Sequence, residues 1–174
     1  MGDSLITIIA IFLAAILLFV FPLVAMSERT DDVSQLAVQT ATADFVDNIR
    51  STGSLSDDDY DKFLSTLAAT GNSYDVEMEV SHLDENPGVK TTQAQMTKIG
   101  ENLYYKEYTT QIEEKLQNNG KISLKQGDLV SVTVKNTNQT IAQSLKSFFY
   151  QLSGDNTYSI SAQKAGIVQV NGKK

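Results

Sequence analysis

Residues 5–26 read LITIIAIFLAAILLFVFPLVAM, a nearly unbroken apolar run that contains no charged side chain. Only Thr7 and Pro22 interrupt it. At a rise of about 1.5 Å per residue, about 22 helical residues extend about 33 Å, which is enough to cross a hydrocarbon core of about 30 Å. The run therefore predicts a transmembrane helix, and the other features of the chain are interpreted around it.

Two interpretations of this run are open, a permanent anchor and a cleaved signal peptide. A signal peptide has a basic start, an apolar stretch of about 7–15 residues and a small-residue cleavage site. Residues 1–4 contain no Lys or Arg and the run is longer than that, although Ala25-Met26-Ser27 fits a cleavage site. We expect an uncleaved single-pass anchor in the cell membrane, with residues 1–4 as a short cytoplasmic tail and the C-terminal domain outside the cell.

Composition restricts the partners of the remaining chain. The net charge is −7, and Lys and Arg are not clustered on any stretch. A nucleic-acid surface needs such clusters, so no nucleic-acid partner is expected. The chain contains no cysteine, so an exported domain of this sequence must be stabilised by its core without disulfides.

A juxtamembrane helix is predicted over residues 27–53, because no Pro or Gly interrupts residues 27–52 and Gly53 is a suitable stop. Pro22 is expected to kink the long helix or to divide its membrane part from the rest. Apolar side chains recur at every fourth residue, with Leu36 and Val38 beside them, and they form a stripe that winds around the axis. The stripe consists of Val33, Ala37, Ala41, Phe45 and Ile49.

Residues 54–174 are predicted to form a small extracellular α+β domain with about three antiparallel strands and several helices. Strands are identified by alternation of apolar and polar residues, and helices by apolar residues spaced three and four apart. The final strand is expected to contain a bulge near Gly166. The expected helices are 56–71, 105–116 and 141–152, and the expected strands are 74–81, 130–134 and 158–170.

Several phrases of the sequence support a family resemblance. They are QTATADFVDNIR at residues 39–50, DYDKF at residues 59–63, and a strand–helix–strand ending that runs from DLVSVTVK at residues 128–135 through Phe148-Phe149 to YSISA at residues 158–162. In this layout the chain resembles the TadE-like, pilin-like membrane proteins of Tad (Flp-type) pilus systems in Gram-positive bacteria. The resemblance covers most of the chain and consists of pattern rather than invariant motif.

The resemblance implies a pilin-like component that meets other pilin-like or assembly subunits through its N-terminal helix. Prepilins of these systems have a basic leader, a small residue at the cleavage point and Glu at the fifth mature position. Here no basic leader precedes Gly2, and the fifth residue after it is Thr7. A minor or accessory component is therefore the expected role.

The residues that carry chemistry favour a non-enzymatic protein without a cofactor or a metal site. His82 shares the parity of the apolar residues of its strand, so we expect a strand-end histidine at the edge of the core. Asp57, Asp58 and Asp59 fit the first turn of a helix, where acids complement the helix dipole. The sequence contains no nucleophile elbow, P-loop or dinucleotide fingerprint.

Two further questions stay open at this point, the place of three tyrosines and the role of the whole chain. The tyrosines at positions 104, 105 and 108 form either an adhesive or assembly patch or part of the core. The chain is either an assembly subunit, an anchored extracellular binding module, or a secreted protein released after Ser27. For the assembly subunit the partners are the lipid bilayer and other subunits. The residues expected to anchor and pack the helix are Ala14, Leu18, Pro22, Leu36, Phe45 and Ile49.

Overall fold

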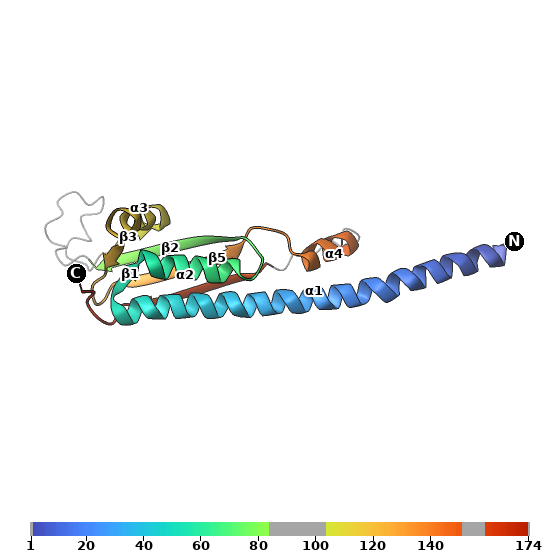
Figure 1. The fold of residues 1–174 in the computed structure, drawn as a ribbon, viewed down its shortest axis with the longest axis horizontal. Coiled ribbons are helices and arrows are strands. Elements are labelled where there is room, and N and C mark those ends of the chain that lie inside the picture. Colours follow the sequence, from blue (N-terminus) through green and yellow to red (C-terminus); the bar gives the residue numbers. More distant parts are fainter. Residues whose placement is uncertain (1, 84–103, 151–158, 174) are drawn as a thin grey trace, which may run out of the picture.

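The computed structural model describes residues 2–83, 104–150 and 159–173. Its largest element is helix α1 (Gly2–Thr52), whose 51 residues extend about 76 Å at 1.5 Å per residue. The first half of α1, which contains the apolar run at residues 5–26, projects away from the small domain (Figure 1). The second half lies along the domain. The helix is continuous through Pro22, so this proline does not end it. A proline removes one backbone hydrogen bond, and here the helix curves gently instead of ending.

The domain is built on a four-stranded antiparallel sheet in the order β3-β2-β5-β6, beside a small β1-β4 ladder. About three strands were expected. The additional strands within the described ranges are short or polar, so they give little apolar alternation. The strands are β1 (Ser54–Ser56), β2 (Tyr74–Leu83), β3 (Tyr104–Tyr108), β4 (Lys121–Ser123), β5 (Leu129–Asn136) and β6 (Ser161–Ile167).

Three further helices are α2 (Asp57–Ala68), α3 (Thr109–Asn119) and α4 (Ile141–Tyr150). The side chain of Ser56 caps α2 by accepting a hydrogen bond from the backbone N–H of Asp59, at 3.2 Å. The expectation of a helix from Tyr105 is wrong, because Tyr104–Tyr108 pairs with β2 and the helix begins only at Thr109. The helical spacing of Tyr105 and Tyr108 was coincidental, since in a strand these two residues lie on opposite faces.

Helix α1 and strand β6 run side by side in the same direction. Gln35 holds one end of β6, because its side chain donates to the carbonyl of Ser161 at 2.6 Å and accepts from the N–H of Ser161 at 2.9 Å. Arg50 holds the other end by donating to the carbonyl of Ile167 at 3.1 Å. The 15-residue step from Gln35 to Arg50 extends about 22 Å along the helix and the six-residue step from Ser161 to Ile167 extends about 20 Å along the strand, so the two elements nearly match in length.

The hydrophobic core lies between the second half of α1, helix α2 and one face of the sheet. Phe45 stacks on Phe63 of α2 with ring centroids 4.3 Å apart and 2° between the ring planes. The alternating valines of β5 complete this layer, each at most 2% exposed. The members of the core from α1 and β5 are Val38, Phe45, Val46, Ile49, Val130, Val132 and Val134.

Two expectations about details are wrong. Strand β6 pairs with β5 in unbroken register, with Gly166 opposite Val130, so there is no bulge near Gly166. A Cβ at Gly166 would collide with the side chain of Arg50, so that side chain would have to move in a substituted protein. The buried stripe of α1 also differs from the expected one, because Val33 and Leu36 are 64% and 65% exposed. The polar residues Asp31, Ser34 and Thr42 of this helix are buried, although they do not belong to the expected stripe.

Candidate functional site: the uncovered half of helix α1 and the base of the domain

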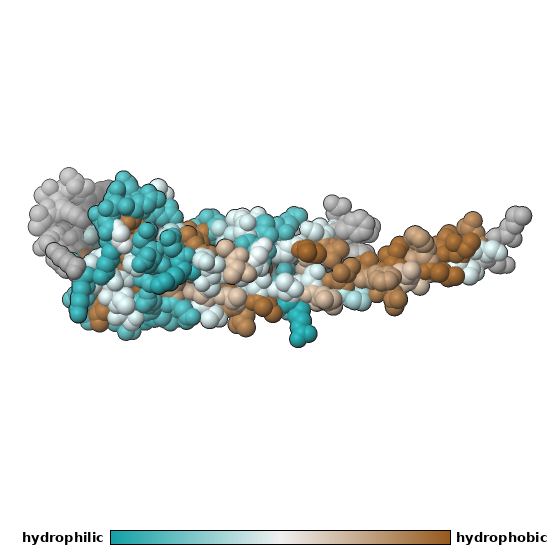
Figure 2. Space-filling model, in the orientation of Figure 1, coloured by the Kyte–Doolittle hydropathy of each residue, from teal (hydrophilic) through white to brown (hydrophobic). Residues whose placement is uncertain are grey.

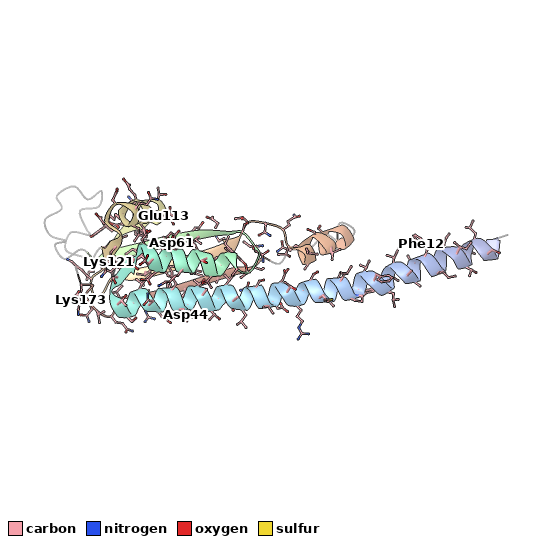
Figure 3. All side chains as sticks on the ribbon, viewed as in Figure 1. Phe12, Asp44, Asp61, Glu113, Lys121 and Lys173 are labelled. Atoms are coloured by element: carbon pink, nitrogen blue, oxygen red, sulfur yellow. The ribbon has the colours of Figure 1, made fainter. Side chains whose placement is uncertain are left out.

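The projecting half of α1 is the largest apolar surface among the described residues. Phe12 and Leu18 are 70% and 72% exposed, and none of the most apolar stretch is buried. Figure 2 shows hydrophobic residues gathered along this half, whereas the domain surface is mostly hydrophilic. Figure 3 shows Phe12 far from every other labelled side chain. The helix is long and apolar enough to span a membrane.

The six residues expected to anchor and pack the helix fall into two groups. Ala14, Leu18 and Pro22 lie in the exposed half, and Leu36 is exposed beside the domain. Phe45 and Ile49 are 6% and 1% exposed, since they belong to the core of the domain itself. The structure therefore leaves four of the six exposed, and it assigns the other two to packing within the domain.

A cavity of about 250 Å³ lies where the exposed half of α1 meets the domain. It is lined by residues of α1, the α2–β2 turn and the segment that leads into α4. Asp31 lines this cavity and is only 7% exposed, and its Oδ2 accepts a hydrogen bond of 2.6 Å from the hydroxyl of Thr140. This contact ties α1 to the start of α4.

Sequence reasoning missed this site, because Asp31 lies within a charged, apparently solvated stretch. The available signal was the pair Thr140 and Gln143, which forms a capping box at the start of α4. Thr140 Oγ1 accepts from the N–H of Gln143 at 3.2 Å, and Gln143 Oε1 accepts from the N–H of Thr140 at 3.1 Å. A capped helix start fixes the position of the hydroxyl that meets Asp31.

A second polar cluster surrounds His82 in the domain. Its Nδ1 lies 2.8 Å from Oδ2 of Asp128, and its Nε2 lies 3.7 Å from Oε2 of Glu107, which also pairs with Lys115. Asp128 is 2% exposed and accepts a further hydrogen bond of 2.9 Å from the N–H of Lys125. These contacts join β2 to the turn that precedes β5. Within the described ranges, no group of three or more side chains suited to a metal ion occurs.

The tyrosines of β3 are exposed, with Tyr104 and Tyr108 on one face of the strand and Tyr105 on the other. Tyr104, Tyr105 and Tyr108 are 50%, 51% and 55% exposed, so the core alternative is wrong. Tyr105 also stacks on the ring of His82, with centroids 4.9 Å apart. Strand β3 lies in the domain, away from the N-terminal end of α1 (Figure 1). An exposed aromatic group of this kind is available for contact with another molecule.

Comparison of the chain with models of protein families, with curated proteins and with solved structures finds no match. Function is therefore inferred from the geometry of this chain.

Proposed function

We propose that this chain is a non-enzymatic, single-pass membrane protein that acts as a minor or accessory pilin-like component of a Tad or type IV-like pilus, or of a related surface assembly. The observation that carries the proposal is the division of α1. One continuous helix has an exposed apolar half and a half that belongs to the domain core. In this proposal residues 5–26 cross the bilayer, residues 1–4 are cytoplasmic and the domain is extracellular.

The continuity of α1 supports an assembly role, because the helix connects membrane and domain without a flexible linker. A contact made by the apolar half then sets the position of the whole domain. In lipid, helices associate through close packing of small residues, since burial from water gives no driving force there. Ala10 and Ala14 are four residues apart and Ala15 is adjacent, so they present a small-residue surface on one side of α1.

The polar clusters support a role without catalysis. A general acid or base needs a free position beside a reacting group. The side chains around His82 are instead engaged with one another and with the turn at Lys125. We propose accordingly that the domain acts through its surfaces.

The membrane part of the proposal is tested by flotation of native membranes and by the N-terminal sequence and intact mass of the chain. An anchor predicts that the protein floats with lipid, resists alkaline extraction and retains residues 5–26. A chain that starts near Glu28 and appears in the medium would instead identify a secreted protein.

The assembly part is tested by cysteine cross-linking in native membranes, which is clean because the chain contains no cysteine. Ala14→Cys is the test variant, and Phe12→Cys is the control at nearly the same depth on the opposite side of α1. We expect cross-linked species from Ala14→Cys and few from Phe12→Cys. Equal cross-linking of both variants would indicate random collision, and none from either would remove the support for assembly through this side of α1.

An anchored extracellular binding module is the second candidate, and the exposed tyrosines of β3 favour it. It predicts a monomer in the membrane whose ligand contacts involve Tyr104 and Tyr108. Cell-surface binding that is lost in a Tyr104→Ser, Tyr108→Ser variant, together with absence of cross-links at Ala14, would favour this candidate over assembly.

A further inference from the structure

The cavity at the base of the domain, where α1 meets the α2–β2 turn and the start of α4, has one charged lining residue. Asp31 is the only charged residue among the described residues that line it. Asp31 is 7% exposed, and the one hydrogen bond that its carboxylate accepts from the described residues is the bond from Thr140 to Oδ2. A carboxylate has about four acceptor positions, so Oδ1 retains its capacity to accept a donor from a bound molecule. A buried anion with one hydrogen bond favours a cationic, hydrogen-bond-donating ligand.

The cavity lies at a defined height above the apolar span. Asp31 follows Met26 by five residues, which places it about 7.5 Å further along the helix axis. The polar headgroup layer is about 5–8 Å thick on each side of the hydrocarbon core. Ser27 lines the same cavity one helical turn before Asp31, on the same side of α1. The opening is therefore at the level of lipid headgroups when residues 5–26 span the bilayer.

We propose that this cavity binds the primary ammonium of an aminophospholipid headgroup, such as that of phosphatidylethanolamine. The inference rests on the membrane anchor proposed above. The cavity of about 250 Å³ is several times the share of about 30 Å³ that one water molecule occupies in the liquid, so it accommodates a headgroup of several heavy atoms. A primary ammonium brings three donors to Asp31, whereas the trimethylammonium of phosphatidylcholine brings none.

Binding at this position also has a structural consequence. Asp31 is joined through Thr140 to the capping box of α4, so the ligand, α1 and α4 meet at one carboxylate. An ammonium at Oδ1 compensates the charge of the carboxylate and stabilises the attachment of α4 to α1. The base of the domain is thereby held at a fixed height on the membrane surface.

The test uses the full chain in nanodiscs made of equal parts of phosphatidylethanolamine, phosphatidylcholine and phosphatidylglycerol. Lipids that stay bound after detergent release are counted by native mass spectrometry. The test variant is Asp31→Asn, and the matched control is Asp32→Asn, which makes the same charge change at the exposed neighbouring residue. Ser27→Phe is a second test variant that fills the cavity from α1 and leaves the carboxylate in place.

We expect wild type and Asp32→Asn to retain phosphatidylethanolamine in preference to phosphatidylcholine. We expect Asp31→Asn to retain about tenfold less of it, because a hydrogen bond to a charged group is lost. Ser27→Phe should lose the preference as well, which keeps the inference testable if Asp31→Asn does not fold. Equal retention of the two lipids by the wild type, or equal preference in wild type and Asp31→Asn, would overturn it.

Two controls separate the possible failures. Flotation tests the anchor independently: a chain that does not float refutes the anchor and this inference together, while a chain that floats without a lipid preference refutes only the inference. An ammonium supplied by a lysine of a second copy is the other source of the same chemistry. Dimers that form without phosphatidylethanolamine and disappear in Asp31→Asn would assign the cavity to that contact and overturn the lipid assignment.

Discussion

The two halves of α1 belong to one continuous helix, yet they are built for different surroundings. In the first half the apolar side chains point outward on every side, as Phe12 and Leu18 illustrate at 70% and 72% exposure. In the second half part of the apolar set packs into the domain, where Phe45 and Ile49 are almost completely buried, while Val33 and Leu36 stay exposed. A helix that is apolar all round requires apolar surroundings, whereas an amphipathic helix requires one packed face.

This difference separates two energetic roles. The second half stabilises the domain, because its apolar side chains leave water when the chain folds. The first half contributes nothing to the domain core, since none of its most apolar stretch is buried. Its apolar side chains lower the free energy only when lipid or another helix covers them and removes them from water. The predictions below test this separation, from the largest expected effect to the smallest.

The largest effect is expected where the second half meets α2. Phe45→Ala removes a ring that stacks on Phe63 and lies near Tyr60, so it should lower the free energy of unfolding by about 3–5 kcal/mol. Leu18→Ala, in the first half, should leave that free energy within about 0.5 kcal/mol of wild type. Denaturant unfolding of the full chain in detergent, followed by near-ultraviolet circular dichroism of the tyrosines, measures both. A similar loss in the two variants would mean that the halves are not energetically separate.

The reverse pattern is expected for insertion into the membrane. Leu18→Arg places a charge near the middle of the apolar run, which costs about 2.5–3.5 kcal/mol at the centre of a spanning helix. Leu36→Arg is the control, since Leu36 is similarly exposed at 65% but lies beyond the run. We expect the fraction of protein that floats with membranes to fall for Leu18→Arg and to stay constant for Leu36→Arg. Unchanged flotation of both variants would count against a spanning role for residues 5–26.

The elements that could be predicted from the sequence are those whose pattern lies within a single segment. The apolar run was predicted from its uninterrupted length, and helix α2 and strands β2 and β5 were predicted from periodic patterns of apolar residues. Helix and strand were confused at Tyr105 and Tyr108, whose spacing fits a helix although β2 pairs with them as a strand. Local spacing does not reveal which segment a short strand will pair with.

Buried polar residues were the least predictable part of the structure. Asp31 and Asp128 are 7% and 2% exposed, yet in the sequence each resembles a solvated charge. Asp31 meets Thr140, which is 109 positions away, and Asp128 meets His82, which is 46 positions away. Contacts at such separations depend on the completed fold, so the candidate site at the base of the domain had no local signal beyond its capping box.

A medium effect is expected at the buried polar cluster of the domain. Asp128→Ala leaves the N–H of Lys125 and the ring of His82 without their acceptor, which should cost about 1–3 kcal/mol of stability. Asp47→Ala removes an exposed carboxylate of α1 that pairs with Arg50 at 2.6 Å, and it should cost at most about 1 kcal/mol. The same unfolding measurement compares the two. Equal losses would show that burial does not decide the contribution of these carboxylates.

The smallest effect is expected from pH, at a tyrosine that packs against the second half of α1. Tyr60 lies beside Phe45 and donates to Oε1 of Glu113 at 2.8 Å. Burial raises the pKa of Tyr60 well above its ordinary value, and the hydrogen bond to Glu113 raises it further. The unfolded chain loses this proton near pH 10, while the folded chain keeps it. Above that pH the unfolded state therefore binds fewer protons, and the free energy of unfolding falls as pH rises.

Tyr60→Phe removes this titration, so its stability should fall less steeply with pH than that of wild type, and the two curves should run parallel below about pH 9. Tyr104→Phe, on the exposed strand β3, is the matched control and should keep the wild-type dependence. Unfolding curves collected at intervals between about pH 7 and pH 11 measure all three chains. A wild-type slope in Tyr60→Phe would assign the alkaline loss of stability to other groups. The packing of Tyr60 against Phe45 would then have to be tested by the core substitution alone.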